Sequence, residues 1–406
     1  MESDNPFAEF GEATGTGIVI DPYPKFLELM AQSPIWEGKL ELEFGLPEMT
    51  MPGTEHSRHF AALSYEAVSQ ILLDGRVFSS RGYANSMGLV MGHSILEMDE
   101  PEHRTYRDML KHAFTLKAMD RWRAEVVQPI VDERVAAFAD RGSADLVAEL
   151  TFPFPIQVIA AMMGLPEKDL PEFHRLAVEL ISIAANIERG FAASQSLRDY
   201  FAGIVAQRRA TPSNDLIGML VAAEIDGKRL TDEEIFAFLR LLLPAGAETT
   251  YRSSSNLLAG LLANPQQLTA LIEDRSLMKQ AIEEGLRWEP PLTTIVRTTT
   301  REVDVCGVPL PAEAQVTVCL GAANHDPARY DDPHTFDIFR KTRTHMAFAT
   351  GAHTCLGMHL AVMETEVALN TLFDRLPNLR LDPDADDVVI SGLMFRAPQH
   401  LPVLFG

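Results

Sequence analysis

The alternation of hydrophobic and polar positions along the chain predicts mostly helices. From Tyr65 onward most segments repeat apolar residues at helical spacing, and prolines such as Pro101 and Pro166 mark the breaks between them. Short apolar runs between turns, which are typical of strands, occupy the chain up to about residue 63, roughly 294–320 and the C-terminal end. The pattern predicts a mainly α protein with a small β-rich portion. Because neither repeats nor a Gly/Ser linker interrupt it, we expect one domain over residues 1–406.

One helical pattern is much longer than the others and runs from Thr231 to Pro265. Thr231 and Glu234 have the spacing of a capping box, and Asn264-Pro265 supplies a stop. At 1.5 Å per residue this helix would be about 50 Å long, enough to cross a whole domain. Apolar residues surround its middle, so we expect a buried central helix.

Polar residues interrupt this helix in the stretch PAGAETT. Pro244 removes a backbone hydrogen bond and predicts a kink. Glu248, Thr249 and Thr250 place a carboxyl and two hydroxyls in the interior, where each unsatisfied group costs about 1–3 kcal/mol. In a kinked core helix the threonines can bond back to the preceding turn, whereas a functional groove would use them on a ligand. The pattern alone favours the two interpretations equally.

The charge balance limits the partners that the protein can have. Lys and Arg number 35 against 57 Asp and Glu, a formal net charge of −22, which argues against nucleic acid and against an anionic membrane surface. No signal peptide and no transmembrane run is recognisable, and three cysteines suit a reducing compartment, so we expect a cytoplasmic protein. Cys306 and Cys319 lie in apolar β-like runs, and we predict that both are small buried hydrophobes.

The third cysteine, Cys355, has an unusual setting in the stretch FATGAHTCLG, just ahead of a helical pattern. Free amide N–H groups and the dipole at a helix N-terminus stabilise a thiolate. Gly351 permits a tight turn, Gly357 leaves room for a flat group, and Phe348 can cover the sulfur from one side. His353 lies two residues away and can reach past the sulfur to an anion.

Three interpretations of this stretch remain open from the residues alone. A lone cysteine is usually a small buried hydrophobe. His345, His353, Cys355 and His359 could form a zinc site of mixed nitrogen and sulfur ligands, although no second cysteine joins them and the glycines stay unexplained. A flat, metal-bearing anion that needs one soft ligand describes haem, and a thiolate ligand on haem iron favours O–O cleavage.

The stretch FATGAHTCLG resembles the haem-binding loop of the cytochromes P450, whose pattern is F-x-x-G-x-H-x-C-x-G. Further resemblances follow in the family's order over nearly the whole chain. They imply the cytochrome P450 fold, with a long central helix over a buried haem b whose iron is bound by Cys355. The stretch departs from many bacterial members at Ala349, where they have glycine, which leaves less room near the sulfur.

The resemblance also implies roles for other residues. AGAETT is similar to the family's oxygen-activating segment, so Thr249 and Glu248 would be catalytic and would deliver protons to dioxygen. Phe348, Gly351, Gly357, Ala245 and Gly246 would lie against the haem. The remaining residues fall into two groups by charge. Donors to the haem propionates would be His103, Arg107, Arg297 and His353. Structural ion pairs would join Glu284 of EEGLRW to Arg287 and to Arg340 of FDIFR.

The implied activity is a monooxygenase that inserts one oxygen atom from O2 into a hydrophobic organic substrate of small to medium size, by hydroxylation or O-dealkylation. The chain has no flavin or iron–sulfur module and no G-x-G-x-x-G fingerprint, so NAD(P)H would act through a separate ferredoxin or flavodoxin-type reductase. Residues 103–123 carry six Lys/Arg against two Asp and, with FRKTR, predict a basic proximal face for that partner. A peroxide-driven peroxygenase and a non-enzymatic haem- or zinc-binding sensor are the alternatives.

The substrate pocket would come from segments far apart in the sequence, namely the loop 85–96, helices near 170–195, the central helix, residues 292–295 and the turn GLMFR. Their largely apolar composition predicts a hydrophobic substrate. The candidate pocket residues are Leu89, Val90, Leu242, Ala247, Leu292, Thr293, Met394 and Phe395. Arg189 could anchor a carboxylate, although a solvated arginine is the simpler interpretation.

Overall fold

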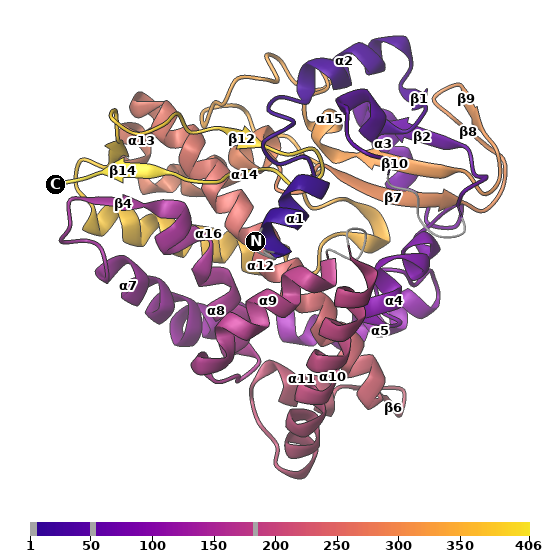
Figure 1. Cartoon of the computed structure of the whole chain (residues 1–406), viewed down its shortest axis with the longest axis horizontal. Helices are drawn as coiled ribbons and strands as arrows, with labels where there is room; N and C mark the ends of the chain where they lie inside the picture. The colour runs from indigo at the N-terminus through magenta and orange to yellow at the C-terminus, as the bar shows by residue number, and fades with distance from the viewer. Residues whose placement is uncertain (1–5, 49–53, 182–185) are drawn as a thin grey trace.

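In the computed structural model, which describes residues 6–48, 54–181 and 186–406, helices form most of the protein. Figure 1 shows them filling the lower and left parts of the molecule, with the main sheet at the upper right. The helices that follow residue 64 are α3 (Tyr65–Leu73), α4 (Met87–Met91), α5 (Glu102–Leu110), α6 (Leu116–Trp122), α7 (Gln128–Ala136), α8 (Pro153–Met162), α9 (Leu170–Ile181), α10 (Ile187–Ala210), α11 (Leu216–Ala222), α12 (Asp232–Ala263), α13 (Pro265–Glu273), α14 (Met278–Trp288), α15 (Leu320–Asn324) and α16 (Met358–Arg375). The mainly α prediction is confirmed.

The strands build one larger sheet and several small ones. The five-stranded sheet has the order β1 (Ile35–Glu37), β2 (His59–Ala62), β10 (Gln315–Cys319), β7 (Thr294–Thr299) and β3 (Phe78–Ser79). β2 and β10 are parallel, and the other neighbours are antiparallel. A second sheet has the order β11 (Arg380–Leu381), β14 (Pro402–Leu404), β4 (Ser143–Asp145). The two-stranded pairs are β5 (Glu224–Ile225) with β6 (Lys228–Arg229), β8 (Val303–Val305) with β9 (Val308–Leu310), and β12 (Ile390–Ser391) with β13 (Ala397–Pro398).

Two expectations about local structure were wrong. The chain before residue 63 holds not only strands but also α1 (Pro6–Ala13) and α2 (Tyr23–Gln32). α2 buries Phe26 and Leu29, which are three residues apart as on one face of a helix. Short apolar runs on either side of them look like strands, and for this reason the helix was not predicted. Cys306 is not a buried strand residue. It is half-buried in the turn between β8 and β9 at φ +53°, whereas Cys319 is fully buried as predicted.

The central helix α12 matches its prediction at both ends. Thr231 is the N-cap, its side chain accepts from the backbone N–H of Glu234, and Glu234 accepts from the N–H of Thr231, which completes the capping box. Asn264 ends the helix, and α12 continues across Pro244 as one helix. It packs against α8, α9, α10, α14 and α16 in the middle of the molecule (Figure 1). Helices from the N-terminal and the C-terminal halves of the chain therefore both pack against α12.

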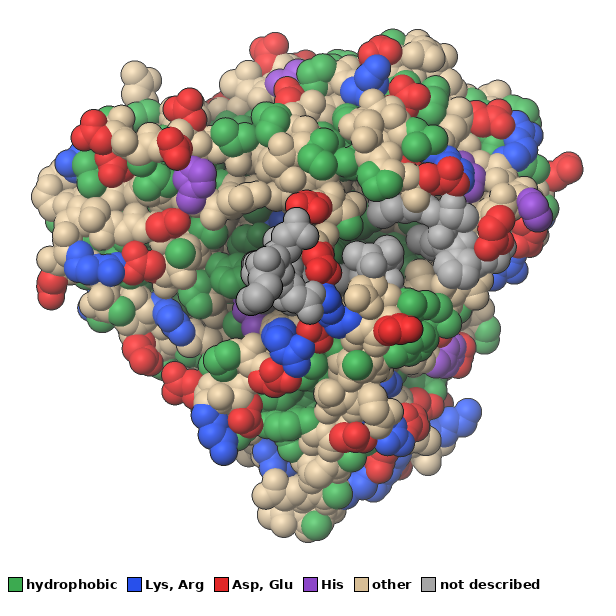
Figure 2. Space-filling model, in the orientation of Figure 1, with side chains coloured by type: hydrophobic (Ala, Val, Ile, Leu, Met, Phe, Trp, Pro, Cys, Tyr) green, Lys and Arg blue, Asp and Glu red, His purple; other side chains and the backbone are tan. Residues whose placement is uncertain are grey.

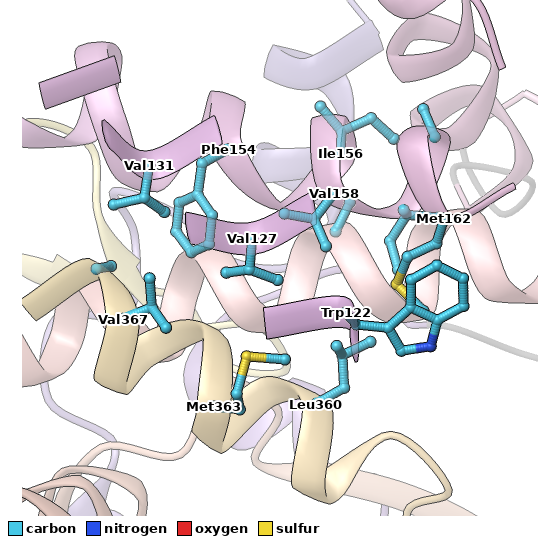
Figure 3. Close-up of a cluster of buried hydrophobic side chains, with 14 of the residues drawn as sticks. Trp122, Val127, Val131, Phe154, Ile156, Val158, Met162, Leu360, Met363 and Val367 are labelled. Atoms are coloured by element: carbon cyan, nitrogen blue, oxygen red, sulfur yellow. The ribbon is translucent and has the colours of Figure 1, made fainter. Parts of the chain in front are cut away.

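A continuous core joins the N-terminal and C-terminal helices beside α12. Figure 3 shows Phe154 and Val158 of α8 pointing toward Val127, with Met363 and Leu360 of α16 below. These side chains are all buried. Burying one such side chain stabilises the fold by about 1.5–3 kcal/mol. The core fixes α16, whose N-terminus carries the loop of Cys355.

Charged side chains are scattered over the face of the molecule that Figure 2 shows. On the face that carries α9 and α10, acidic and basic side chains are intermixed, and hydrophobic ones gather toward the middle (Figure 2). Within the residues that the structure describes, no helix is both long and apolar enough to cross a membrane.

Candidate active site

Cys355 lies three residues before α16, as the sequence predicts. A backbone hydrogen bond and a glycine with positive φ give its loop its shape. The N–H of Cys355 donates to the carbonyl of Phe348 at 2.9 Å, which closes the loop. Gly351 has φ +78°, and a Cβ there would lie 2.3 Å from the carbonyl oxygen of Leu72, so glycine is required. A Cβ on Gly357 would meet no protein atom within 4 Å, so the approach to the start of α16 is open.

Ala349 occupies a position that favours glycine. Its φ is +54°, in the left-handed region. An L-residue with a Cβ costs roughly 1–2 kcal/mol in that conformation. The departure noted in the sequence therefore strains the backbone as well as reducing the room near the sulfur.

The sulfur of Cys355 is suited to metal binding. Cys355 has solvent-accessible surface. The protein atoms around the thiol nevertheless desolvate it, and this desolvation raises its pKa. The backbone N–H groups of Gly357 and Met358 and the charge of Arg107 partly counteract this by lowering the pKa. Because a metal ion deprotonates a coordinating thiol, these donors would stabilise the thiolate once metal is bound.

Four donor side chains meet beside this loop. Arg107 of α5 donates from Nη2 to the carbonyl of Thr354 at 2.5 Å, which joins α5 to the cysteine loop. The rings of His103 and His353 have centroids 4.0 Å apart. Burial, together with the charges of His103, Arg297 and Arg107, lowers the pKa of His353 to about 3. The four predicted donors to the propionates are thus brought together.

One of these donors, His103, has unsatisfied ring nitrogens within the described residues. Its side chain is 1% exposed. Its nearest carboxylate, that of Glu100, is 3.8 Å from Nδ1, beyond hydrogen-bond distance. Burial also lowers the pKa of Arg107 and Arg297. Buried donors of this kind call for an anion, and two carboxylates beside a soft sulfur ligand fit the haem group.

The zinc interpretation is wrong. Across residues 6–48, 54–181 and 186–406, no three His, Cys, Asp or Glu side chains are grouped to hold a metal ion. His345 is buried and lies 3.3 Å from a carboxylate oxygen of Glu283, and His359 is exposed. The four residues of that hypothesis therefore do not converge.

On α12, Thr249 and Glu248 make separate contacts. The hydroxyl of Thr249 donates to the carbonyl of Ala245 at 2.7 Å, the back-bond expected of a helical threonine. Ala245 is exposed although it lies in the middle of a largely buried helix. A Cβ on Gly246 would lie 2.7 Å from Cδ1 of Ile159, so this glycine allows close packing against α8, and its assignment to the haem stays a prediction.

Glu248 is 3% exposed and lies between two basic side chains. Its Oε1 is 3.8 Å from Nε2 of His174, and its Oε2 is 3.1 Å from Nη2 of Arg252. Burial raises the pKa of Glu248, but His174 and Arg252 together lower it by more, so the net pKa lies below the usual range. Glu248 is therefore ionised at neutral pH.

The predicted ion-pair residues meet at a buried cluster. Arg287 contacts Glu284 through two bonds of 2.7 and 2.8 Å, and both side chains are at most 5% exposed. Arg287 also donates to the backbone carbonyls of Asn324 and Pro333. Arg340 approaches the same carboxylate at 3.3 Å. The cluster joins α14 to the segment that leads into the cysteine loop.

The candidate pocket residues are only partly brought together. Leu292 and Phe395 form a β-bridge, and the N–H of Thr293 donates to the carbonyl of Met394. Thr293 is fully buried and its hydroxyl donates to the carbonyl of Leu393, so its role here is structural. The other candidates lie on two packed helices. α4 carries Leu89 and Val90, and α12 carries Leu242 and Ala247. Residues 182–185 of the expected pocket region lie outside the described residues, and Arg189 pairs with Glu9 at 2.7 Å.

Sequence reasoning missed several buried charges. His174 and Arg252 were not foreseen as partners of Glu248. Glu364 of α16 is 1% exposed, and burial raises its pKa well above the usual range, although Thr250 offers it a hydrogen bond. Arg396 pairs with Glu289 at 2.8 Å, both buried. An acid on the apolar stripe of a helical pattern was the available signal for Glu364, whereas the other pairs join distant segments.

A thiolate-ligated haem is the class of site that this geometry defines, and comparisons with known proteins agree. The family profile described as Cytochrome P450 matches residues 167–390. The chain is 33% identical to cytochrome P450 monooxygenase PikC of Streptomyces venezuelae, over 98% of this chain and 94% of that one. It is 36% identical to 6-deoxyerythronolide B hydroxylase of Saccharopolyspora erythraea, over 75% of this chain and 76% of that one.

A solved structure has the same fold. That of CYP109Q5 from Chondromyces apiculatus superimposes with a TM-score of 0.84 at 30% identity, over 97% of each chain. The chain therefore belongs to the bacterial cytochromes P450. It is a monooxygenase with the cytochrome P450 fold that uses haem b and O2, with electrons of NAD(P)H supplied through redox partners and a small organic molecule as substrate.

Proposed function

We propose that the protein hydroxylates or O-dealkylates a hydrophobic substrate of small to medium size and receives its electrons from a separate ferredoxin or flavodoxin-type reductase. The observation that carries the proposal is the sulfur of Cys355 just before α16, beside four donors at least half-buried, of which His103 has no hydrogen-bond partner among the described residues. We further propose the cytoplasm as its compartment, since all three cysteines are unpaired.

In this proposal each residue has a limited task. His103, Arg107, Arg297 and His353 hold the haem propionates, and Cys355 binds the iron. The bound haem supplies the activation of dioxygen. Glu248, ionised at rest, takes up a proton and passes it toward the hydroxyl of Thr249, which lies one residue further along α12. The carbonyl of Ala245 orients that hydroxyl.

Thr249→Ala should uncouple electron uptake from product formation. Without the hydroxyl, protons are delivered less selectively and reduced oxygen escapes as peroxide. We expect product per NAD(P)H to fall about tenfold or more. The measurement uses a ferredoxin and its reductase with a fluorogenic alkoxycoumarin that shifts the haem spin state, and it records NAD(P)H, peroxide and product together. Thr249→Ser, which keeps the hydroxyl, is the matched control. Tight coupling in Thr249→Ala would contradict the assignment.

The apolar side chains of the candidate pocket residues favour the proposed substrate class. Val90 and Ala247 are buried, Leu242, Met394 and Phe395 are half-buried, and Leu89 is exposed on α4. Such a lining favours hydrophobic ligands with few polar groups. Relatives named as hydroxylases act by the same class of reaction.

The redox partner is proposed to dock beside the cysteine loop. Arg107 joins α5 to this loop, and Arg104, Lys111 and Lys117 nearby are exposed. Arg340 of the predicted face contacts Glu284, and Arg123 pairs with Glu366, so these two cations are already engaged with acids. The exposed cations would attract an acidic ferredoxin.

Raising the ionic strength should therefore slow reduction by an acidic ferredoxin. Between about 0.01 and 0.15 M salt the Debye length falls from about 30 to 8 Å, and we expect the second-order rate constant to fall about tenfold. Stopped-flow spectroscopy measures the rate. Lys117→Glu should lower it at low salt, whereas Lys228→Glu in the β5–β6 hairpin is the control. A rate that is independent of salt would exclude the basic docking face.

A further inference from the structure

Arg240 of α12 is a buried cation that has only neutral partners among the described residues. Its side chain is 7% exposed. Nε donates to the carbonyl of Phe236 at 3.3 Å, and Nη1 donates to the hydroxyl of Ser194 at 2.7 Å. The acid that attracts it, Glu233, forms its ion pair with Arg198 at 2.5 Å. Because a buried charge is costly unless it is paired, Arg240 calls for an anion that the described chain does not supply.

The remaining nitrogen of this guanidinium faces the end of α4. Within the described part of the chain, Nη2 donates no hydrogen bond, although a guanidinium has N–H donors on all three nitrogens. Gly92 ends α4 with φ +86°, and a Cβ there would lie 3.0 Å from Nη2 of Arg240. Glycine at this position therefore allows the cation to lie against the backbone while its Nη2 stays available to a ligand.

Arg240 lies where the helices of the candidate pocket meet. α4, which carries Leu89 and Val90, packs against both α10 and α12. Ser194 of α10 accepts from Arg240 and donates its own hydroxyl to the carbonyl of Val90, so the cation is bound into this junction. Arg240 precedes Thr249 by nine residues, which is about 14 Å along the axis of α12. An anion on Arg240 would therefore lie far from the oxygen-activating segment.

We propose that Arg240 binds the carboxylate of the substrate, so that the substrate is a hydrophobic acid with a chain of medium length. The inference rests on the proposed function, in which Thr249 marks the place of oxidation. The planar guanidinium, held through Nη1 by Ser194, offers charge-assisted hydrogen bonds to the carboxylate. The apolar chain then extends along α12 toward Thr249, and oxidation takes place at the end of the chain that is remote from the acid.

A purely structural role for Arg240 makes a different prediction about stability. In Arg240→Met the hydroxyl of Ser194 keeps its bond to Val90, and the carbonyl of Phe236 keeps the backbone N–H of its own helix. Methionine therefore leaves no buried polar group unsatisfied, and an apolar side chain in place of a buried charge is often neutral or stabilising. We expect an unchanged or higher midpoint of thermal unfolding, whereas a lower midpoint would indicate a structural residue and count against the proposal.

The binding test compares decanoate with methyl decanoate, which share a chain and differ in charge. Read from the spin-state shift of the holoenzyme, we expect decanoate to bind at least about tenfold tighter than the ester. Arg240→Met should abolish this preference by weakening decanoate, with the ester within about twofold of the wild type. Arg240→Lys, which keeps the charge but not the planar fork, should retain part of it. The control is Arg209→Met, which removes an exposed cation paired with Asp232 and should leave the preference intact.

Several results would overturn this assignment. Equal affinity for acid and ester in the wild type, or a preference that survives in Arg240→Met, would exclude a carboxylate on Arg240. Oxidation of decanoate next to its carboxylate would exclude the proposed orientation. Acetate carries the carboxylate without the chain, so displacement of decanoate by a similar concentration of acetate would make this a site for a free anion. The proposed function is judged separately, by the carbon monoxide spectrum of the wild type and its turnover of the alkoxycoumarin.

Discussion

Cys355→Ala will yield a protein that lacks the strongly red-shifted Soret band of thiolate-bound haem in the reduced, carbon monoxide-bound state. The sulfur lies directly before α16 with the N–H groups of Gly357 and Met358 beside it. Alanine offers no ligand, so the thiolate donation that favours O–O cleavage is lost. We expect monooxygenase activity to fall to background and the haem content of the purified protein to fall as well.

Cys306→Ala is the matched control for that experiment. Cys306 is also a free cysteine, but it lies in the β8–β9 turn and is half-buried. Its replacement should leave the carbon monoxide spectrum unchanged. A red-shifted band that survives Cys355→Ala would refute thiolate ligation by this residue, and with it the proposed function.

Arg287→Met will destabilise the protein by about 3–5 kcal/mol, because it leaves the carboxylate of Glu284 buried without its strongest partner. The backbone carbonyls of Asn324 and Pro333 would lose their donor at the same time. Since a domain of this kind has only about 5–15 kcal/mol of stability, such a loss should give mostly haem-free or insoluble protein. Arg340 would retain part of the attraction at 3.3 Å.

The measurement is denaturant unfolding followed by both haem absorbance and tryptophan fluorescence. Arg123→Met is the matched control, because Arg123 pairs with Glu366 at 2.7 Å with about two fifths of each side chain exposed. Exposed pairs of this kind contribute about 0–1 kcal/mol. If Arg287→Met cost no more than Arg123→Met, the buried cluster would not be what holds α14 to the cysteine loop.

Much of the fold could be predicted because it follows from local rules. The capping box of Thr231 and Glu234 and the stop at Asn264 delimit α12 in the sequence as in the structure, since capping depends on neighbouring residues. The strands between residues 294 and 319 were also predicted from their apolar runs. α2 was missed because its short helical stripe lies among β-like runs.

The site residues divide in the same way. Cys355, Gly351 and Gly357 belong to one loop, so their spacing carries the signal and the structure adds the φ of Gly351. The assignment of Gly246 to the haem stays a prediction, and the structure adds that the glycine packs closely against Ile159 of another helix, a contact that spacing cannot show. The strain at Ala349 likewise became visible only as a positive φ.

The sequence by itself determined the α-helical class, the central helix and the cysteine loop, because caps, periodicity and turn glycines act within a few residues of one another. Only the tertiary structure decided which charges are buried together. The pairs of His174 with Glu248 and of Arg396 with Glu289 join segments that are distant in the chain. The ring of His103, whose nitrogens have no hydrogen-bond partner among the described residues, likewise lies against His353 from a distant segment. Whether a charge is paired, solvated or left for a ligand is set by burial and by neighbours in space, and neither can be read from one stretch of residues.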